Sequence, residues 1–107
     1  MGGHTRYTFE WDPIKAGQNL RKHGISFDRA AEVFLDPLAI SIFDEEHSER
    51  EERWVTLGKD KRGIVLVLIH TFWEVAVGEC KIRIISARKA SRRETEQYEE
   101  TSHEAGI

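Results

Sequence analysis

The segment KIRIISARKASRR at residues 81–93 constrains the fold more than any other, because it interleaves isoleucines with basic residues and ends in a helix-start signal. Successive side chains of a β-strand point to opposite faces, so residues two apart share a face. Both faces carry apolar residues here. Ile82 and Ile84 lie on one face, and Ile85 and Ala87 lie on the other together with Arg83. A strand that is apolar on both faces belongs inside a sheet.

A helix is predicted directly after this strand. Ser91 and Glu94 have the spacing of a capping box, in which the serine hydroxyl accepts from a helix-start N–H and the glutamate reaches back. The helix should begin at about Arg92, which leaves Arg88 and Lys89 in the strand-to-helix connection. Free N–H groups and cations at such a connection favour a phosphate. For any single arginine, a weak surface pair with a carboxylate is an equally good interpretation.

The other elements follow from short local signals. Alternating aromatic residues predict a half-buried strand over residues 7–11. Asp-Pro at 12–13 starts a helix that runs to about His23, and Gly24 supplies its left-handed end. Ser26 caps a second helix, whose apolar stripe runs to residue 35 before a second Asp-Pro stops it. Further strands are predicted over residues 38–43, 53–57 and 64–70, with 73–79 forming another strand or a hairpin arm.

Two helices, a run of strands and a final helix predict an α+β fold: a mostly antiparallel β-sheet with two N-terminal helices and one C-terminal helix packed on it. The length of 107 residues fits a single domain. We place this domain at residues 7–100, after a flexible N-terminus at 1–6 and before a frayed tail at 101–107.

Charge is unevenly distributed along the chain, whose formal net charge is −3. Residues 61–93 carry eight basic and two acidic side chains, whereas residues 25–60 carry four and ten. This asymmetry predicts a cationic face that suits a polyanion or a charged protein partner. The longest apolar run, residues 64–69, is too short to cross a bilayer, and no signal-peptide pattern is present, so a cytoplasmic protein is expected.

The acidic stretch 44–52 has two interpretations. Four of its side chains are of metal-ligand types: Asp44, Glu45, Glu46 and His47. Adjacent side chains on an extended segment point to opposite sides, however, so a solvated loop is favoured over a metal site. We therefore predict no metal and no cofactor. The single cysteine, Cys80, lies among apolar residues and is predicted to be a core residue rather than a nucleophile.

Taken together, these landmarks resemble the BrnT family of bacterial toxins. The N-terminal ones are Phe9-Glu10-Trp11-Asp12, Lys15-Ala16, Asn19, Lys22-His23-Gly24-Ile25-Ser26-Phe27 and Ala30. The later ones are Val33-Phe34, Asp36-Pro37, Arg53, Gly58, Arg83-Ile84-Ile85-Ser86-Ala87-Arg88-Lys89-Ala90, Glu94 and Tyr98. The resemblance covers nearly all of residues 7–100, and KHG-x-S-F with RIISARKA makes it specific. Residues 72–81 depart from it, because this segment is longer than is usual in the family.

The resemblance implies a RelE-like ribonuclease fold and the role of toxin in a bacterial type II toxin–antitoxin system. It implies a metal-independent endoribonuclease that cleaves RNA to arrest growth. It also implies neutralisation by a BrnA-type antitoxin with a ribbon-helix-helix DNA-binding domain. The resulting 2:2 complex would contact DNA only through the antitoxin and would repress its own operon.

Cleavage of RNA without a metal requires a group that takes the 2′-hydroxyl proton, cations that stabilise the phosphorane, and a donor for the 5′ oxygen. Arginines bind phosphate oxygens in pairs, and we assign this role to Arg53, Arg83 and Arg88. Strict alternation puts Arg83 and Arg88 on opposite faces unless the strand ends or twists between them. His23 is the acid–base candidate, although a C-cap role is equally favoured. His70 is better interpreted as a core or edge histidine.

Further RNA contacts are assigned to four side chains, of which the first two are also proton-transfer candidates: Lys22, Tyr98, Lys89 and Arg92. Two rival interpretations keep the same cationic face, a non-catalytic RNA-binding module and a protein-interaction domain. Single-strand binders typically expose aromatic residues, and the aromatic residues here fall at core-like positions, which disfavours the first rival.

Overall fold

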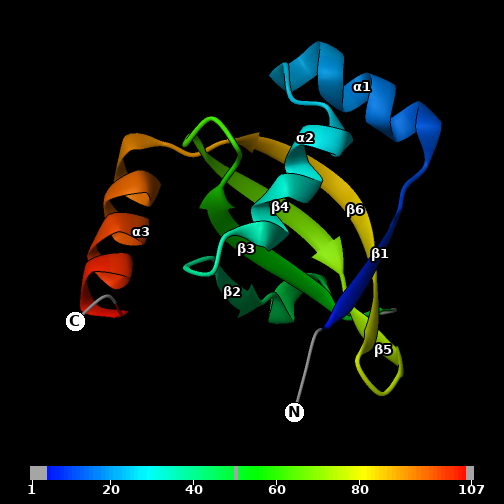
Figure 1. The fold of residues 1–107 in the computed structure, drawn as a ribbon. Coiled ribbons are helices and arrows are strands. Elements are labelled where there is room, and N and C mark those ends of the chain that lie inside the picture. Colours follow the sequence, from blue (N-terminus) through cyan, green and yellow to red (C-terminus); the bar gives the residue numbers. More distant parts are fainter. Residues whose placement is uncertain (1–4, 50, 106–107) are drawn as a thin grey trace.

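A computed structural model describes residues 5–49 and 51–105 of the chain. Within these residues the strands are β1 Arg6–Glu10, β2 Ile40–Phe43, β3 Arg53–Lys59, β4 Val65–Thr71, β5 Trp73–Ala76 and β6 Glu79–Lys89. They form one sheet in the order β1-β6-β4-β3-β2, and β5 pairs with the start of β6 (Figure 1). Among the described strands only β1 runs parallel to its neighbour, β6, which confirms the mostly antiparallel sheet.

The α-helices in the described part of the chain are α1 Pro13–His23, α2 Phe27–Ala31 and α3 Arg92–Ala105. Asp12 caps α1 by accepting from the N–H of Ile14 at 2.8 Å, and Gly24 ends it with a φ of 71°, as the sequence predicts. The second helix differs from its prediction, because it continues after α2 as the 3-10 helix η1, Glu32–Leu35. The tighter i→i+3 turn is a common way to finish a helix before the chain turns away.

Three predicted boundaries are wrong by a few residues. β1 already begins at Arg6, because the N–H of Arg6 donates to the carbonyl of Gly78 at 2.7 Å. β3 continues through Gly58 to Lys59, beyond its predicted end at residue 57, because Lys59 still pairs with Val65. α3 continues to Ala105 through most of the predicted frayed tail. Residues 1–4 and 106–107 lie outside the described residues.

The sheet is covered on both faces, as the apolar character of its inner strands requires (Figure 1). On one face, the chain from the end of α1 to η1 packs on the inner strands β4 and β6, and the buried residues there are Ile25, Phe27, Ala30, Val33, Leu66, Leu68, Ile82, Ile84 and Ala87. On the other face, Tyr98 of α3 packs on Leu57, Val65 and Val67. None of the described helices is long and apolar enough to span a membrane.

A β-bulge interrupts the alternation of β6. Ile69 of β4 pairs with Ser86, but the next residue, His70, pairs with Ile84, so Ile85 is the extra residue. The bulge moves Ala87 to the face of Ile84, which corrects the prediction that Ala87 shares a face with Arg83. It also places Arg83, Ser86 and Arg88 together on the opposite face.

The segment after β4 forms a hairpin arm, which settles the alternative left open by the sequence. β5 pairs antiparallel with the start of β6, and the turn between them contains Gly78 with a φ of 75°. Cys80 lies in this part of β6 and is buried, as predicted. Burial raises the pKa of its thiol, and so does the nearby carboxylate of Glu74, which fits a core residue rather than a nucleophile.

Candidate active site

Two of the predicted arginines lie on one face of the sheet at the same end. Arg53 is the first residue of β3 and pairs with Thr71, the last residue of β4. On the other side of β4, the N–H of Arg83 in β6 donates to the hydroxyl of Thr71 at 3.3 Å. Paired residues on neighbouring strands point to the same face, so the two arginine side chains project together from positions on either side of Thr71.

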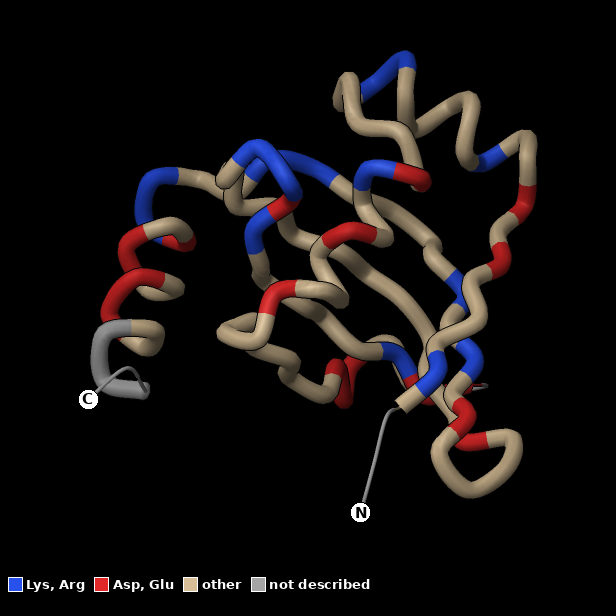
Figure 2. Tube along the Cα trace, viewed as in Figure 1, with Lys and Arg blue, Asp and Glu red and all other residues tan. Residues whose placement is uncertain are grey.

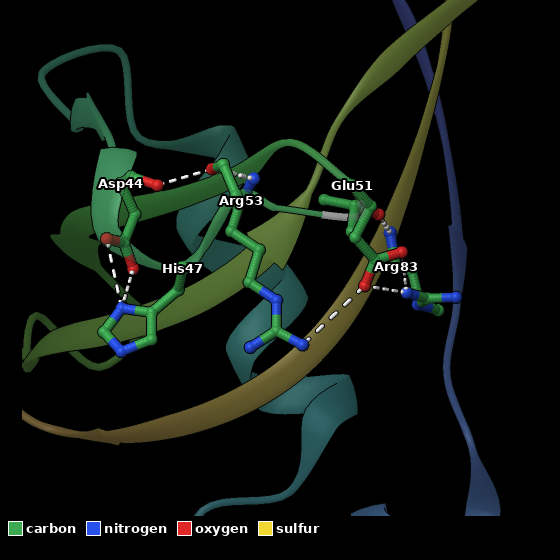
Figure 3. A network of polar contacts seen from close by, with 7 residues as sticks. Asp44, His47, Glu51, Arg53 and Arg83 are labelled. Atoms are coloured by element: carbon green, nitrogen blue, oxygen red, sulfur yellow. Dashed lines mark hydrogen bonds and ion pairs between the residues drawn. The ribbon is translucent and has the colours of Figure 1, made fainter.

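The carboxylate of Glu51 lies between the two guanidinium groups (Figure 3). Arg83 Nη2 donates to both carboxylate oxygens of Glu51, and Arg53 Nη2 lies 3.8 Å from Oε1. Side chains of Glu51, Arg53 and Arg83 are 36%, 34% and 39% exposed. Glu51, Arg53 and Arg83 together carry a formal charge of +1, and the carboxylates of Glu46 and Glu49 line the adjacent hollow.

A histidine–aspartate pair lies beside this cluster (Figure 3). His47 Nδ1 is 3.0 Å from Asp44 Oδ2, so the carboxylate holds the Nδ1–H and leaves Nε2 for another partner. Asp44 precedes the short 3-10 helix η2, Glu45–His47. Its backbone N–H donates to the carbonyl of Arg53 at 2.8 Å, and the N–H of Arg53 donates to Ser48 Oγ at 3.0 Å. These bonds fix the loop against the start of β3.

The loop and β3 together enclose a hollow of about 530 Å³, lined by Glu46, His47, Glu49, Glu51 and Arg53. An imidazole, three carboxylates and one guanidinium therefore face one solvent-accessible space. The predicted solvated loop is thus correct as a description of exposure. His47 and Glu51 were not predicted as site residues from the sequence, where His47 was weighed only as a metal ligand, and the structure adds both to the candidate site.

Arg88 does not join this cluster. Its guanidinium forms a two-pronged pair with Glu94, at 2.8 and 2.9 Å, across the predicted capping box at the start of α3. The hydrogen bonds from Arg88 hold the pKa of Glu94 at about 2 despite partial burial, and Glu94 raises the pKa of Arg88. Arg88 is five residues from Arg83, or roughly 16 Å along a strand. The predicted convergence of three arginines is therefore wrong for Arg88.

His23 and Lys22 also lie elsewhere. Both are in the last turn of α1 and line a separate groove beside Ile85 and Ser86 of β6. The structure thus separates the predicted acid–base histidine from the pair Arg53 and Arg83.

The remaining predicted RNA contacts differ in accessibility. Lys89 and Arg92 are exposed where β6 meets α3, in a region where basic residues gather (Figure 2). Tyr98 is only 2% exposed, and its hydroxyl donates to Asp36 Oδ2 at 2.5 Å. Tyr98 is a core residue, which corrects its assignment as an RNA contact, because a buried ring cannot stack on a base.

His70 is a core histidine, in line with the favoured interpretation. Its Nδ1 lies 3.0 Å from the carbonyl of Thr71 and its Nε2 lies 2.6 Å from the hydroxyl of Thr56. A carbonyl only accepts, so Nδ1 carries the proton and Nε2 accepts from Thr56. Burial lowers the pKa of His70, although the bond to Thr71 opposes this. Both ring nitrogens are therefore occupied within the core.

A small α+β domain that gathers arginine, carboxylate and imidazole groups on an accessible sheet face has the chemical equipment of a ribonuclease. A comparison with known protein families identifies the kind of ribonuclease. Residues 11–94 match the family described as "Ribonuclease toxin, BrnT, of type II toxin-antitoxin system", and the chain belongs to this family. The resemblance noted from the sequence motifs is thereby confirmed.

A solved structure supports the same assignment. The chain is similar to the ribonuclease toxin BrnT of Brucella abortus, with 26% sequence identity and a TM-score of 0.55. The similarity covers 82% of this chain and 100% of the Brucella chain. A comparison with curated protein sequences gives no significant match.

Proposed function

We propose that this chain is a metal-independent endoribonuclease toxin that acts at the cluster of Glu51, Arg53 and Arg83. The observation that carries the proposal is the shared carboxylate of Glu51 between two arginines of separate strands. Two guanidinium groups directed at one point match the paired oxygens of a phosphodiester. Membership of a family of ribonuclease toxins supplies the reaction class.

In this proposal the scissile phosphate lies against Arg53 and Arg83, and displaces part of their contact with Glu51. The freed carboxylate accepts the proton of the 2′-hydroxyl as its oxygen attacks phosphorus. The two guanidinium groups stabilise the additional negative charge of the phosphorane, which is where fixed cations lower a barrier most. The bond from phosphorus to the 5′ oxygen then breaks, leaving a 2′,3′-cyclic phosphate.

His47 is the proposed donor of a proton to the departing 5′ oxygen. Its Nδ1 is held by Asp44, so its Nε2 is the nitrogen that faces substrate. Histidine is the side chain suited to giving and taking protons near neutral pH, and a carboxylate that orients the ring is a common arrangement for this task. The reaction thus begins with a proton transfer to Glu51 and ends with one from His47, which leaves a free 5′-hydroxyl.

These groups perform each step of the reaction without a Lewis acid, which is the basis for proposing a metal-independent enzyme. The same side chains also form a poor metal site. Within the described parts of the chain, no three His, Cys, Asp or Glu side chains are grouped so that they could hold a metal ion.

The proposed partner is a BrnA-type antitoxin with a ribbon-helix-helix domain, in a 2:2 complex that contacts DNA through the antitoxin alone. A type II toxin–antitoxin toxin has a protein antitoxin by definition of the class, which supports the partner in general terms. The cytoplasm, where RNA and antitoxin are both available, is the proposed location.

Incubation of the purified protein with end-labelled RNA in excess EDTA tests the proposal. We expect cleavage that yields 2′,3′-cyclic phosphate ends and that is lost in Arg53→Ala and Arg83→Ala. RNA that is bound but left intact would instead identify a non-catalytic binding module. Cleavage that requires an added divalent metal would contradict the proposed mechanism but leave the family assignment in place.

A further inference from the structure

A second groove lies between α1 and the bulged part of β6. Five residues of α1 and two residues of β6 line its space of about 300 Å³, among them Lys15, Lys22, His23 and Ser86. Two of these are lysines and one is a histidine, and none of the described residues that line the groove carries a carboxylate. The hollow at the candidate active site has a lining of the opposite kind, because three glutamates line it.

The two lysines of this groove form no ion pair with the described carboxylates. Among the side chains described for residues 5–49 and 51–102, no carboxylate lies within 4.0 Å of the Lys15 or Lys22 ammonium groups. Figure 2 shows basic residues along α1. The C-terminal end of a helix carries partial negative charge, so an anion here would be held by side chains rather than by the backbone. Lysine ammonium, serine hydroxyl and amide groups are suited to phosphate oxygens.

The wall of the groove is fixed in place by Asn19. Its side-chain amide makes hydrogen bonds to both the N–H and the carbonyl of Ala87, so α1 is tied to the edge of β6. Lys22 and His23 follow Asn19 by three and four residues, which is one turn of the helix. Their positions relative to β6 are therefore set by the fold rather than by a loop.

The groove borders the same sheet face as the candidate active site. The bulge at Ile85 turns Ser86 to the face of Arg83. Three residues of a strand span roughly 10 Å, so Ser86 is about that far from Arg83. A nucleic-acid strand whose scissile phosphate lies at Arg83 would carry a neighbouring phosphate to Ser86 and Lys22.

We propose that the α1–β6 groove is a second phosphate-binding subsite, which holds the RNA backbone beside the scissile bond. This inference rests on the proposed function for the direction of the strand, and Lys15 and Lys22 are its anchoring cations. Arg21 provides a matched control, because it is on the same helix and carries the same charge but does not line the groove.

The test uses Lys22→Gln, Lys15→Gln and Arg21→Gln in the full chain. The binding probe is a fluorescent twelve-nucleotide RNA with 2′-O-methyl groups, which cannot undergo attack by its own 2′ oxygen, so affinity is measured independently of cleavage. We expect each groove variant to weaken binding roughly tenfold, as loss of one charge-assisted contact would give. We also expect each to lower the slope of log affinity against log salt by about 0.7, the value for one phosphate contact with a single strand. Arg21→Gln should change affinity by less than about twofold.

Cleavage of two substrates provides the second measurement. A dinucleotide contains only the scissile phosphate, so Lys22→Gln should lower kcat/KM for this substrate far less than for a longer RNA. The same variant should lower kcat/KM for a twelve-nucleotide RNA by about tenfold, mainly through KM.

Several outcomes would overturn the inference. They are an equal loss in Arg21→Gln, unchanged RNA affinity in both groove variants, equal losses on the dinucleotide, or no RNA binding by the parent protein. Loss of antitoxin binding with RNA affinity intact would assign the groove to the protein partner instead. Weaker RNA binding in the groove variants of a protein that cleaves nothing would support the subsite and contradict the proposed function. RNA cleavage that the groove variants leave unchanged would support the proposed function and contradict the subsite.

Discussion

The side chain of Asn19 hydrogen-bonds to both backbone polar groups of Ala87, 68 positions later in the chain. Its Oδ1 accepts from the Ala87 N–H at 3.1 Å, and its Nδ2 donates to the Ala87 carbonyl at 2.8 Å. β1 pairs with β6 only as far as Arg83, so beyond that point the edge of β6 lacks a strand. The amide of Asn19 takes the place of a strand backbone there.

The first prediction concerns this contact. Asn19→Ala should lower the free energy of unfolding by roughly 2–4 kcal/mol, because it leaves both Ala87 groups and the carbonyl of Ile25 without their partner. Urea unfolding followed by circular dichroism measures the loss. Gln18→Ala, at an exposed neighbouring position, serves as the control and should cost less than about 0.5 kcal/mol. Equal effects of the two changes would contradict the role of the amide.

The second prediction concerns catalysis. Arg83→Ala should lower kcat/KM for RNA cleavage by about 10²–10³, the range seen when one group that stabilises a developing oxyanion is removed. Glu51→Gln should lower it by about 10²–10⁴, because the amide cannot accept the 2′-hydroxyl proton. Arg88→Ala is the comparison, since Arg88 is paired with Glu94 away from the cluster. A larger loss for Arg88→Ala than for Arg83→Ala would show that the active site has been misplaced.

The third prediction concerns pH. The hydrogen bonds from Arg88 hold the pKa of Glu94 at about 2, against an ordinary value of 4.5. A carboxyl whose pKa is depressed in the folded state stabilises the fold above its unfolded pKa and loses that contribution as pH falls towards its folded pKa. Glu94→Gln should therefore be about 1–2 kcal/mol less stable at pH 7, allowing for solvent screening. This difference should shrink between pH 4.5 and pH 2.

Unfolding curves of both proteins across this pH range provide the measurement. Glu96→Gln, on an exposed position of the same helix, is the control. A stability difference for Glu94→Gln that stays constant with pH would mean that the ion pair contributes nothing.

The fourth prediction compares two glycines. A Cβ added at Gly58 would lie 2.6 Å from Val33 Cγ1 and 3.0 Å from Ala39 Cβ, so Gly58→Ala must push η1 away from β3. We expect a loss of roughly 1–3 kcal/mol. At Gly17, within α1, the nearest atom to an added Cβ is Arg21 Nη1 at 3.6 Å, and alanine should stabilise the helix by up to about 1 kcal/mol. Thermal unfolding should therefore shift in opposite directions for the two variants.

The fifth prediction concerns Tyr98. Tyr98→Phe removes the hydrogen bond to Asp36, which also accepts from the backbone N–H groups of Leu38 and Lys59. The variant should lose about 1 kcal/mol of stability and keep the RNA affinity of the parent protein. Calorimetry and anisotropy check the two parts. A drop in RNA affinity without a change in stability would restore Tyr98 to the substrate-binding surface.

The elements that sequence patterns predicted best are those set by neighbours in the chain. The N-cap Asp12, the left-handed Gly24 and the capping box of Ser91 and Glu94 involve residues within a few positions of one another. Their geometry therefore depends on the spacing of nearby residues, and all of them occur at the positions predicted from the sequence.

Features set by tertiary pairing were not accessible in this way. The bulge at Ile85 arises from the register between β6 and β4, and no local signal marks it. The contact of Glu51 with Arg83 joins residues 32 positions apart across the sheet edge. The acidic loop directly before Arg53 is a signal present in the sequence. Sequence patterns could not show, however, that the carboxylate of Glu51 in this loop contacts two arginines.

The bulge at Ile85 also bears on how the length of this chain can vary. Ile85 is the extra residue, so deleting it would remove the bulge while Ser86, Ala87 and Arg88 keep their partners on β4 and the faces to which they point. Insertions should be tolerated far better in the turn that contains Gly78, because the residues of this turn lie outside the paired strands. Homologous proteins are therefore expected to differ in length at that hairpin tip, and by one residue at the bulge, while the paired parts of β4 and β6 keep their length.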